Sequence, residues 1–187
     1  MIFTATTLKE AWLIEPERRE DDRGFFARTW CETEFAAHGL EGRWVQSSVS
    51  FNRDKGTLRG LHYQRAPYEE VKLVRCTRGS IYDVIVDLRP DSPDFKRHLA
   101  VVLTAADGRA LYVPKGFAHG FQTLEHDTEV LYCMSQVYVP AAAAGVRWDD
   151  RAFGIMWPEG TRTMSDRDRG YPDFAGAEVV GQGGSGR

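Results

Sequence analysis

Apolar and polar residues alternate along the middle of this 187-residue chain, and the helical period of apolar residues is largely absent there. The alternating runs are rich in Val, Ile, Tyr and Leu, and they are separated by Gly, Pro, Asp or Asn, as strands are separated by turns. The pattern predicts strands over residues 43–51, 57–64, 71–77, 80–88, 98–104, 110–113, 118–123 and 128–139. Since these runs follow one another without helices between them, the sequence favours an antiparallel all-β sandwich or barrel.

Helical signals are short and lie outside this central region. One helix is predicted over residues 32–38, with Gly39 as its C-terminal stop. Residues 165–169 and the YPDF stretch after them are predicted to form a turn or one helical turn. No internal repeat or linker divides the sequence, so residues 1–180 are predicted to form a single domain. The Gly-rich residues 181–187 are predicted to be a flexible tail.

The charge balance argues against one class of partner. Lys and Arg number 24 against 27 Asp and Glu, which gives a net charge of −3. A nucleic-acid-binding protein usually carries an excess of positive charge, so no nucleic-acid partner is expected. The basic residues are mostly Arg, the side chain that grips a phosphate with two parallel hydrogen bonds.

Cysteine usage and hydropathy indicate the compartment. Cys31, Cys76 and Cys133 are widely spaced and include no CxxC pair, so neither a disulfide framework nor a structural zinc site is predicted. The N-terminal residues lack the pattern of a signal peptide, and no apolar run approaches the roughly 20 residues that cross a bilayer. The sequence therefore predicts a soluble, cytoplasmic protein that does not enter a membrane.

Two polar residues stand at strand positions that point to the core. Lys72 shares strand parity with Val74 and Cys76, and Tyr132 is in step with Val130. The Lys72 side chain either extends outward at the strand end or places a cation inside a barrel, where it stabilises developing negative charge. Tyr132 is either a packing residue with one hydrogen bond or a proton donor within a pocket.

Two histidines raise the same question. His62 shares strand parity with Leu58 and is predicted to face the interior, and His119 begins a strand after a Pro/Gly turn. Each is either a hydrogen-bonded core residue or a group with a chemical role. The segment PKGFAH, which ends at His119, matches Pro-x-Gly-x-x-His, the second motif of the cupin superfamily of double-sheet jelly rolls.

Most cupin enzymes bind a metal through this histidine and an earlier His-x-His pair. Here the earlier segment reads His62-Tyr63-Gln64, so a glutamine stands where the second histidine is expected. Because glutamine is a poor substitute for imidazole as a ligand of a transition metal, we predict no metal site and no metal cofactor. A metal-dependent cupin enzyme is the alternative, and it rests on PKGFAH alone.

A longer set of motifs resembles one family of this superfamily. DDRGFFARTW, GTLRGLHYQ, KLVRC, IYDVIVDLRPDSPDF, LYVPKGFAHGFQTL, GVRWDD, IMWP and SDRD occur in the order seen in the dTDP-4-dehydrorhamnose 3,5-epimerase family, from about Asp21 to Asp168. The resemblance implies a cupin-like double-sheet jelly roll with short peripheral helices, which forms a homodimer and uses no cofactor. It also implies epimerisation at C3, C5 or both of a nucleotide-linked 4-keto-6-deoxy sugar, through an enolate, in deoxysugar biosynthesis.

The resemblance gives four residues a part in proton transfer. His62 matches the family's base, and Asp168 matches the carboxylate that pairs with this base and fixes its tautomer. Lys72 matches the group that stabilises the enolate oxygen. Tyr132 matches the acid that returns a proton to the opposite face of the sugar.

Five further residues are implied to serve substrate binding. Arg23, Arg59 and Gln46 match positions near the nucleotide diphosphate, His119 matches a second pocket histidine, and Asp83 is predicted to orient His119.

Arg59 presents a geometric difficulty. Counting along the strand places it on the face opposite to His62. Both side chains reach one pocket only if Gly60 introduces a bulge, which is a known use of glycine within a strand.

The sequence departs from the family in one strand. The usual Gln-x-Asn-x-Ser-x-Ser pattern here starts at Gln46, with Ser48 in place of Asn and Asn52 in place of the final Ser. This strand forms part of the nucleotide end of the pocket in relatives, so the base, the final sugar and the number of carbons epimerised stay open. The alternatives are a single-carbon epimerase acting on another nucleotide sugar and a non-catalytic cupin that binds a nucleotide sugar.

Overall fold

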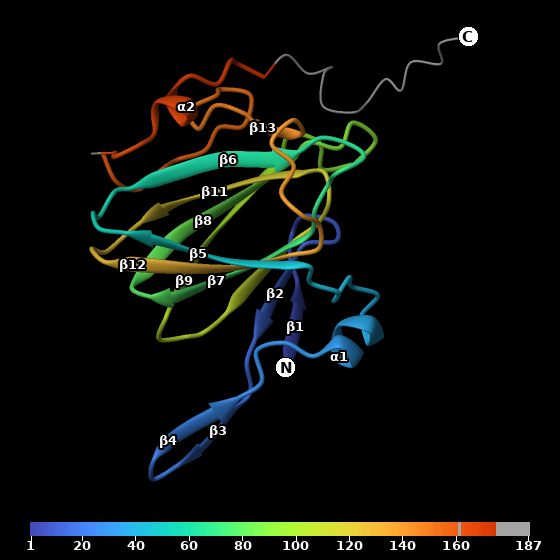
Figure 1. Cartoon of the computed structure of the whole chain (residues 1–187), viewed down its shortest axis with the longest axis vertical. Coiled ribbons are helices and arrows are strands. Elements are labelled where there is room, and N and C mark those ends of the chain that lie inside the picture. Colours follow the sequence, from blue (N-terminus) through green and yellow to red (C-terminus); the bar gives the residue numbers. More distant parts are fainter. Residues whose placement is uncertain (161, 175–187) are drawn as a thin grey trace.

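A computed structural model describes residues 1–160 and 162–174, which form two facing antiparallel sheets with two short helices beside them (Figure 1). The six-stranded sheet has the order β1 (Ile2–Ala5), β2 (Trp12–Glu15), β10 (Ala110–Val113), β7 (Lys72–Arg78), β12 (Thr128–Met134) and β5 (Gln46–Asn52). The five-stranded sheet has the order β13 (Ala143–Gly145), β6 (Leu58–Gln64), β11 (Phe117–Thr123), β8 (Ser80–Asp87) and β9 (His98–Thr104). Strands far apart in the sequence pair within both sheets, as in a cupin-like jelly roll.

The main hydrophobic core lies between the two sheets. Alternate residues of facing strands supply it, and they include Val74 of β7, Val130 of β12, Ile85 of β8 and Phe121 of β11. All four are at most 1% exposed. Lys72 and Tyr132 have the same strand parity as these inward residues, so the inward direction predicted for both is confirmed.

Two smaller clusters cover the outer faces of the sheets. Phe35 of α1 (Glu32–Ala37) packs with Ile14 and Tyr112 on the outer face of the six-stranded sheet. Leu58 and Trp157 belong to a cluster on the outer face of the five-stranded sheet. The chain after β13 crosses this face and ends the described region beyond α2 (Asp166–Arg169), which packs against β6 (Figure 1).

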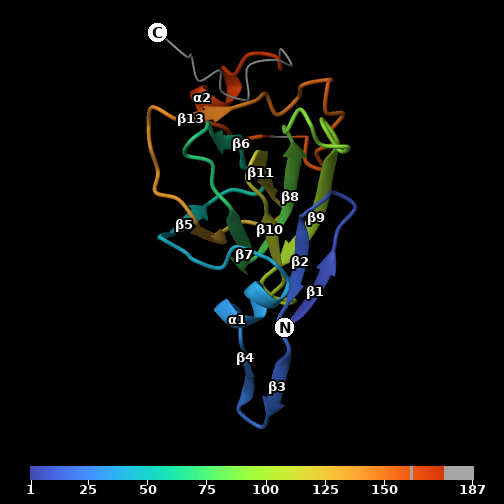
Figure 2. The ribbon, with the colours of Figure 1, turned by 90° about the vertical axis from the view of Figure 1, so that its right-hand side faces the viewer.

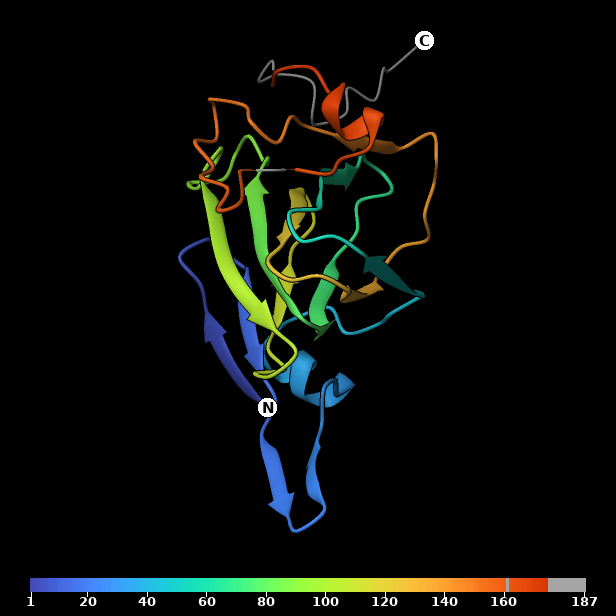
Figure 3. The same cartoon turned by 90° about the vertical axis from the view of Figure 1, so that its left-hand side faces the viewer.

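A two-stranded hairpin extends away from both sheets. β3 (Arg18–Asp21) pairs with β4 (Gly24–Ala27), and all three ribbon views show the hairpin projecting beyond α1 (Figure 1, Figure 2, Figure 3). Its two phenylalanines are exposed, Phe25 by 57% and Phe26 by 74%. The hairpin therefore presents apolar surface to the outside of the described chain.

The strand pattern predicted the centre of the fold better than its ends. All eight predicted strands are present, but β5 begins at Gln46 and β12 ends at Met134, so residues 43–45 and 135–139 lie outside strands. The short helices at residues 32–38 and 165–169 are present in nearly the predicted positions. The N-terminal strands, the hairpin and β13 were not predicted. Residues 175–180 of the predicted domain, and the predicted tail, lie outside the described residues.

No helix in the described ranges has the length and apolar character needed to cross a membrane.

Candidate active site

A cavity of about 350 Å³ opens between the two sheets. Six of the nine predicted site residues line it: Gln46 from β5, Arg59 and His62 from β6, Lys72 from β7, His119 from β11 and Tyr132 from β12. Asp168 and Asp83 lie directly behind two of these side chains. Arg23 is elsewhere.

His62 and Asp168 form a close pair. His62 Nε2 lies 2.7 Å from Asp168 Oδ1, and the Gly60 N–H donates to Asp168 Oδ2 over 3.3 Å. Burial disfavours the charged carboxylate, but the hydrogen bonds from His62 and from Gly60 outweigh it, and the pKa of Asp168 lies below its usual value. An ionised Asp168 accepts the Nε2 proton of a neutral His62 and leaves Nδ1 as the basic nitrogen.

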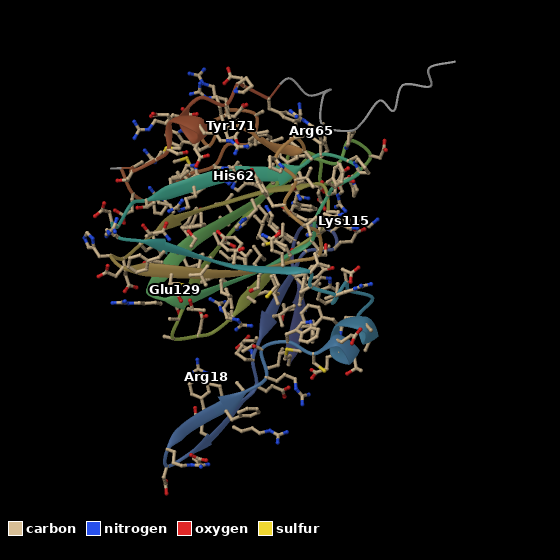
Figure 4. All side chains as sticks on the ribbon, in the orientation of Figure 1. Arg18, His62, Arg65, Lys115, Glu129 and Tyr171 are labelled. Carbon is tan, nitrogen blue, oxygen red and sulfur yellow. The ribbon has the colours of Figure 1, made fainter. Side chains whose placement is uncertain are left out.

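The placement of Asp168 depends on α2. The side chain of Ser165, the residue before this helix, accepts a hydrogen bond from the Asp168 N–H and so caps the first turn. Tyr171 follows the helix, and its ring lies against the His62 imidazole with the ring centroids 6.1 Å apart. Figure 4 shows Tyr171 beside His62, on the α2 side of β6.

Lys72 connects the two sheets. It starts β7 in the six-stranded sheet, and its Nζ donates to the backbone oxygen of His62 in the five-stranded sheet over 3.2 Å. The same Nζ lies 3.2 Å from Glu70 Oε1. The Lys72 side chain is 10% exposed, so the strand-end interpretation, with the ammonium extended into solvent, is wrong.

Tyr132 faces His62 from the opposite sheet. It packs on the core cluster, and its ring meets that of His119 edge to face, with 5.8 Å between centroids. Burial raises the pKa of Tyr132 well above 10, and the charge of Asp83 adds to this effect. The phenol is therefore in its protonated form at neutral pH, and it lines the cavity.

His119 is the more enclosed of the two histidines. Its Nε2 lies 2.7 Å from Asp83 Oδ1, and its side chain is 3% exposed against 42% for His62. The contact predicted between Asp83 and His119 is therefore present. His62 is the histidine more accessible to a ligand.

The predicted bulge at Gly60 is present. β6 pairs His62 with His119 but Arg59 with Phe121, so β6 has one more residue than β11 between these two pairs. The extra residue turns Arg59 to the same side as His62, and both line the cavity. The bulge also corrects one prediction, because Leu58 does not face the interior with His62 and instead packs on the outer face of the sheet.

The two departures in β5 face the cavity side of the sheet. Asn52 Oδ1 accepts a hydrogen bond from Arg59 Nε over 2.7 Å, and the Asn52 amide donates to the backbone oxygens of Ser50 and Thr128. Asn52 therefore fixes the direction of the Arg59 guanidinium. Ser48 lines the cavity beside Tyr132, its partner across the strand pair.

Arg23 does not reach this cavity. It lies at the tip of the β3–β4 hairpin, 89% exposed, with its guanidinium 2.6 Å from Asp21. Figure 4 labels Arg18 on the same hairpin, at the opposite end of the molecule from His62. Within its own chain, Arg23 is therefore not part of the cavity lining, and its predicted contact with the nucleotide stays a prediction.

Several lining residues were missed by the sequence predictions. Glu70, Gln64 and Tyr138 all border the cavity. Gln64 follows His62 at the two-residue spacing that keeps a strand face, and Glu70 precedes Lys72 at the same spacing, so a signal was available for both. Tyr138 lies in the loop after β12, where the predicted strand was too long.

The residues that would hold a metal in a cupin do not gather into a ligand set here. Gln64 Nε2 donates to Glu70 and to backbone oxygens, and Gln64 Oε1 accepts from the Val139 N–H. Within the part of the chain that the structure describes, no three His, Cys, Asp or Glu side chains are grouped to bind a metal ion.

The fold and the site together define a proton-transfer enzyme built on a cupin-like jelly roll. An imidazole with its carboxylate stands on one sheet, a protonated phenol stands on the other, and an ammonium group reaches from one sheet to the other.

Comparisons with known proteins identify the family. The family model described as dTDP-4-dehydrorhamnose 3,5-epimerase matches residues 5–176. The dTDP-4-dehydrorhamnose 3,5-epimerase of Sinorhizobium fredii is 39% identical over 175 residues, which cover 93% of this chain and 90% of that protein. The chain belongs to the dTDP-4-dehydrorhamnose 3,5-epimerase family, and it is an epimerase.

Solved structures agree in fold. The dTDP-4-dehydrorhamnose 3,5-epimerase of Bacillus anthracis, with TDP and PPi bound, aligns with a TM-score of 0.90 and 42% identity over 92% of this chain and 99% of that one. A 3'-monoepimerase of Streptomyces bikiniensis in complex with dTDP-quinovose aligns with a TM-score of 0.85 and 34% identity, covering 92% and 88% of the two chains.

Proposed function

We propose that this cavity epimerises C3 and C5 of dTDP-4-dehydro-6-deoxyglucose to give dTDP-4-dehydrorhamnose. The protons on these carbons are acidic because the neighbouring C4 carbonyl takes up the charge as an enolate. Each inversion needs a base on one face of the ring, a stabiliser at the carbonyl oxygen and an acid on the other face. The cavity holds one candidate for each role.

His62 is the base. Its Nε2–H donates to Asp168, so Nδ1 accepts the proton from carbon and the resulting imidazolium is stabilised by the ionised carboxylate. General base catalysis of this kind contributes about 10²- to 10⁴-fold to a rate.

Lys72 stabilises the enolate. The electron pair of the broken C–H bond moves to the C4 oxygen, and the ammonium is fixed in advance beside the cavity by two acceptors. A fixed donor at a developing oxyanion contributes on the order of 3–4 kcal/mol to the transition state.

Tyr132 completes the inversion. It stands on the sheet that faces His62, and its phenol is protonated at neutral pH, as its pKa lies above 10. Protonation of the enolate carbon from this side leaves the carbon inverted. The placement of acid and base on facing sheets is the observation that carries the proposal.

The diphosphate is bound at the β5 end of the cavity. Arg59, held by Asn52, and Gln46 supply hydrogen-bond donors there. The protein acts as a homodimer in the cytoplasm, and the hairpin of one protomer carries Arg23 to the nucleotide bound in its partner. The exposed phenylalanines of the hairpin and the distance of Arg23 from its own cavity support this arrangement.

Exchange with solvent tests the assignment of the base. In D2O, the wild-type protein is expected to introduce deuterium into dTDP-4-dehydro-6-deoxyglucose, and His62→Asn is expected to slow this exchange by roughly 10²- to 10⁴-fold. His126→Asn is the matched control, because His126 is exposed and outside the cavity lining. Equal exchange by wild type and His62→Asn would refute His62 as the base.

The same assay separates the alternatives. Deuterium at one carbon only indicates a single-carbon epimerase, and exchange with CDP- or GDP-linked sugars, but not with the dTDP-linked sugar, indicates another nucleotide. Binding of the sugar nucleotide without exchange at either carbon indicates a non-catalytic binding protein.

A further inference from the structure

A hydrogen bond and an ion pair connect three side chains along one wall of the cavity. Gln64 Nε2 donates to Glu70 Oε2 over 2.9 Å, and Glu70 Oε1 lies 3.2 Å from Lys72 Nζ. Gln64 is 4% exposed, and the Glu70 side chain is 11% exposed. These contacts end at Lys72, which carries the one ammonium group among the residues that line this cavity.

The backbone fixes the direction of the Gln64 amide. The N–H of Val139 donates to Gln64 Oε1 over 2.7 Å, which identifies this atom as the oxygen. The amide nitrogen then faces three acceptors, namely the backbone oxygens of Tyr68 and Val137 and the carboxylate of Glu70. Gln64 therefore presents an N–H to Glu70, and no rotation of the amide improves the arrangement.

Glu70 in turn fixes Lys72. An ammonium carries three N–H donors. One donates to the backbone oxygen of His62, and the Glu70 carboxylate forms an ion pair with the ammonium at 3.2 Å, so the ammonium keeps donor capacity for a ligand in the cavity. A lysine ammonium on its four-carbon stem is otherwise free to adopt many rotamers. Because the side chain is already fixed before the substrate binds, the reaction does not have to supply the conformational entropy that is lost when one rotamer is selected.

We infer that Glu70 and Gln64 are positioning residues that hold the Lys72 ammonium where the enolate oxygen of the substrate forms. This inference rests on the proposed function and adds two residues to its machinery. Gln64 occupies the place of the second histidine in the His-x-His pair of metal-binding cupins. In this chain, the glutamine at that position donates a hydrogen bond to the Glu70 carboxylate, and this carboxylate forms an ion pair with the Lys72 ammonium.

Kinetics of three variants test the inference. Glu70→Gln and Gln64→Leu are each expected to lower kcat for deuterium exchange by roughly 10- to 100-fold, the cost of a misplaced catalytic group, with KM within about twofold of wild type. Glu69→Gln is the matched control, because this neighbouring carboxylate lines a different cavity, and its kcat is expected to be unchanged. A rise in KM with unchanged kcat in Glu70→Gln would overturn the inference.

A double-mutant cycle separates positioning from general structure. If Glu70 acts through Lys72, Glu70→Gln causes no further loss of exchange in a Lys72→Ala background. If Glu70→Gln lowers the rate of exchange roughly 10- to 100-fold both in the wild-type protein and in Lys72→Ala, then Glu70 does not act through Lys72.

A measurement without substrate keeps the inference separate from the proposed function. The chain has five lysines, Lys9, Lys55, Lys72, Lys96 and Lys115, so the side-chain ammonium resonances can be assigned by NMR one variant at a time. The Lys72 resonance is expected to exchange slowly with water in wild type and in Glu69→Gln, and to shift or broaden in Glu70→Gln and Gln64→Leu. An unchanged Lys72 resonance in both of the last two variants overturns the inference, whatever the exchange assay shows. Lack of exchange by the wild type instead refutes the proposed function.

Discussion

At the scale of single residues, exposure to the cavity distinguishes the two histidines as candidates for the base. Both histidines of the cavity hold a carboxylate 2.7 Å from Nε2, but the imidazole of His62 is partly exposed and that of His119 is almost fully buried. A base must reach a proton on carbon, so exposure to the cavity favours His62. In the proposed mechanism, Asp168 both selects the tautomer of His62 and stabilises its charged form.

Acid titration is expected to reveal the state of Asp168. Its pKa is lower in the folded chain than its ordinary value of 3.8, so protonation favours unfolding. The contribution of Asp168 to the free energy of unfolding is therefore complete above about pH 4 and is lost as the pH falls through the folded pKa. In denaturant unfolding, the free energy of unfolding of Asp168→Asn is expected to be roughly 1–3 kcal/mol lower than that of wild type at pH 5, and the difference is expected to be smaller at pH 3.

Asp91→Asn provides the control for this titration, because Asp91 is exposed. Its difference from wild type is expected to stay near zero throughout. If Asp168→Asn lowers the free energy of unfolding by the same amount at pH 5 and at pH 3, the result would contradict a lowered pKa of Asp168.

Removal of the Tyr132 hydroxyl is expected to separate the two proton transfers. Tyr132→Phe keeps the ring contact with His119 but has no proton to give. His62 still removes and returns protons on its own face, so exchange continues, while net inversion falls by roughly 10²- to 10⁴-fold. NMR of the sugar in D2O measures both quantities in one sample, and equal loss of exchange and inversion would contradict the assignment of Tyr132 as the acid.

At the scale of elements, the bulge in β6 assembles the site. It brings Arg59 and His62 to one face, and the N–H of Gly60 itself bonds to Asp168. Gly60 has a φ of +125°, and a Cβ at this position would lie 2.6 Å from the Cα of Gly120 in the neighbouring strand. Only glycine fits both the backbone angle and the close approach of β11.

Gly60→Ala is therefore expected to lower the free energy of unfolding by roughly 2–4 kcal/mol. Gly24→Ala is the matched control, since Gly24 has nearly the same φ, +126°, but has no neighbouring atom within 4 Å of the added carbon. Thermal and denaturant unfolding are expected to show the smaller loss for Gly24→Ala, and equal losses would contradict the role of the contact with Gly120.

The same element shows what the sequence could and could not predict. Alternation of apolar residues predicted the central strands, and the parity of Lys72 and Tyr132 correctly placed both inside. Parity misplaced Leu58, because a bulge reverses the faces of all residues beyond it and only Gly60 marks where that happens. β3 was missed because its sequence, Arg-Arg-Glu-Asp, is wholly polar and exposed and carries no alternation.

The departures in β5 illustrate a further limit. The sequence identified Ser48 and Asn52 as unusual but gave no reason for them. The structure supplies one for Asn52, whose side-chain oxygen accepts a hydrogen bond from Arg59, a residue seven positions further along the chain, beyond the intervening turn. A contact between neighbouring sheets depends on tertiary packing, which local pattern does not encode.

At the scale of the whole molecule, the hairpin is the part that the two sheets do not explain. It projects from the body and exposes Phe25 and Phe26, and it carries Arg23 far from the cavity of its own chain. A homodimer in which the hairpin lies against the partner accounts for both observations, because it covers the apolar surface and brings a cation to a nucleotide.

Phe26→Glu tests this arrangement. In the proposed dimer the partner covers Phe26, so a carboxylate at this position is expected to shift the protein toward monomer in light scattering and to weaken the binding of dTDP. Met156→Glu is the control, because Met156 is also exposed, by 81%, but lies between Ile155 and Trp157, which belong to the cluster on the outer face of the five-stranded sheet. A dimer that is unaffected by Phe26→Glu would contradict an interface at the hairpin.

The central claim is that one cavity inverts both carbons that flank the C4 ketone. The most direct test is conversion of dTDP-4-dehydro-6-deoxyglucose by the wild-type protein in D2O, with mass spectrometry and NMR of the sugar that forms. Because each inversion takes one proton from carbon and returns one from the solvent pool, the account predicts a product with the rhamnose configuration and deuterium at both C3 and C5. Deuterium at a single carbon, or a sugar recovered without deuterium from folded protein, would contradict it.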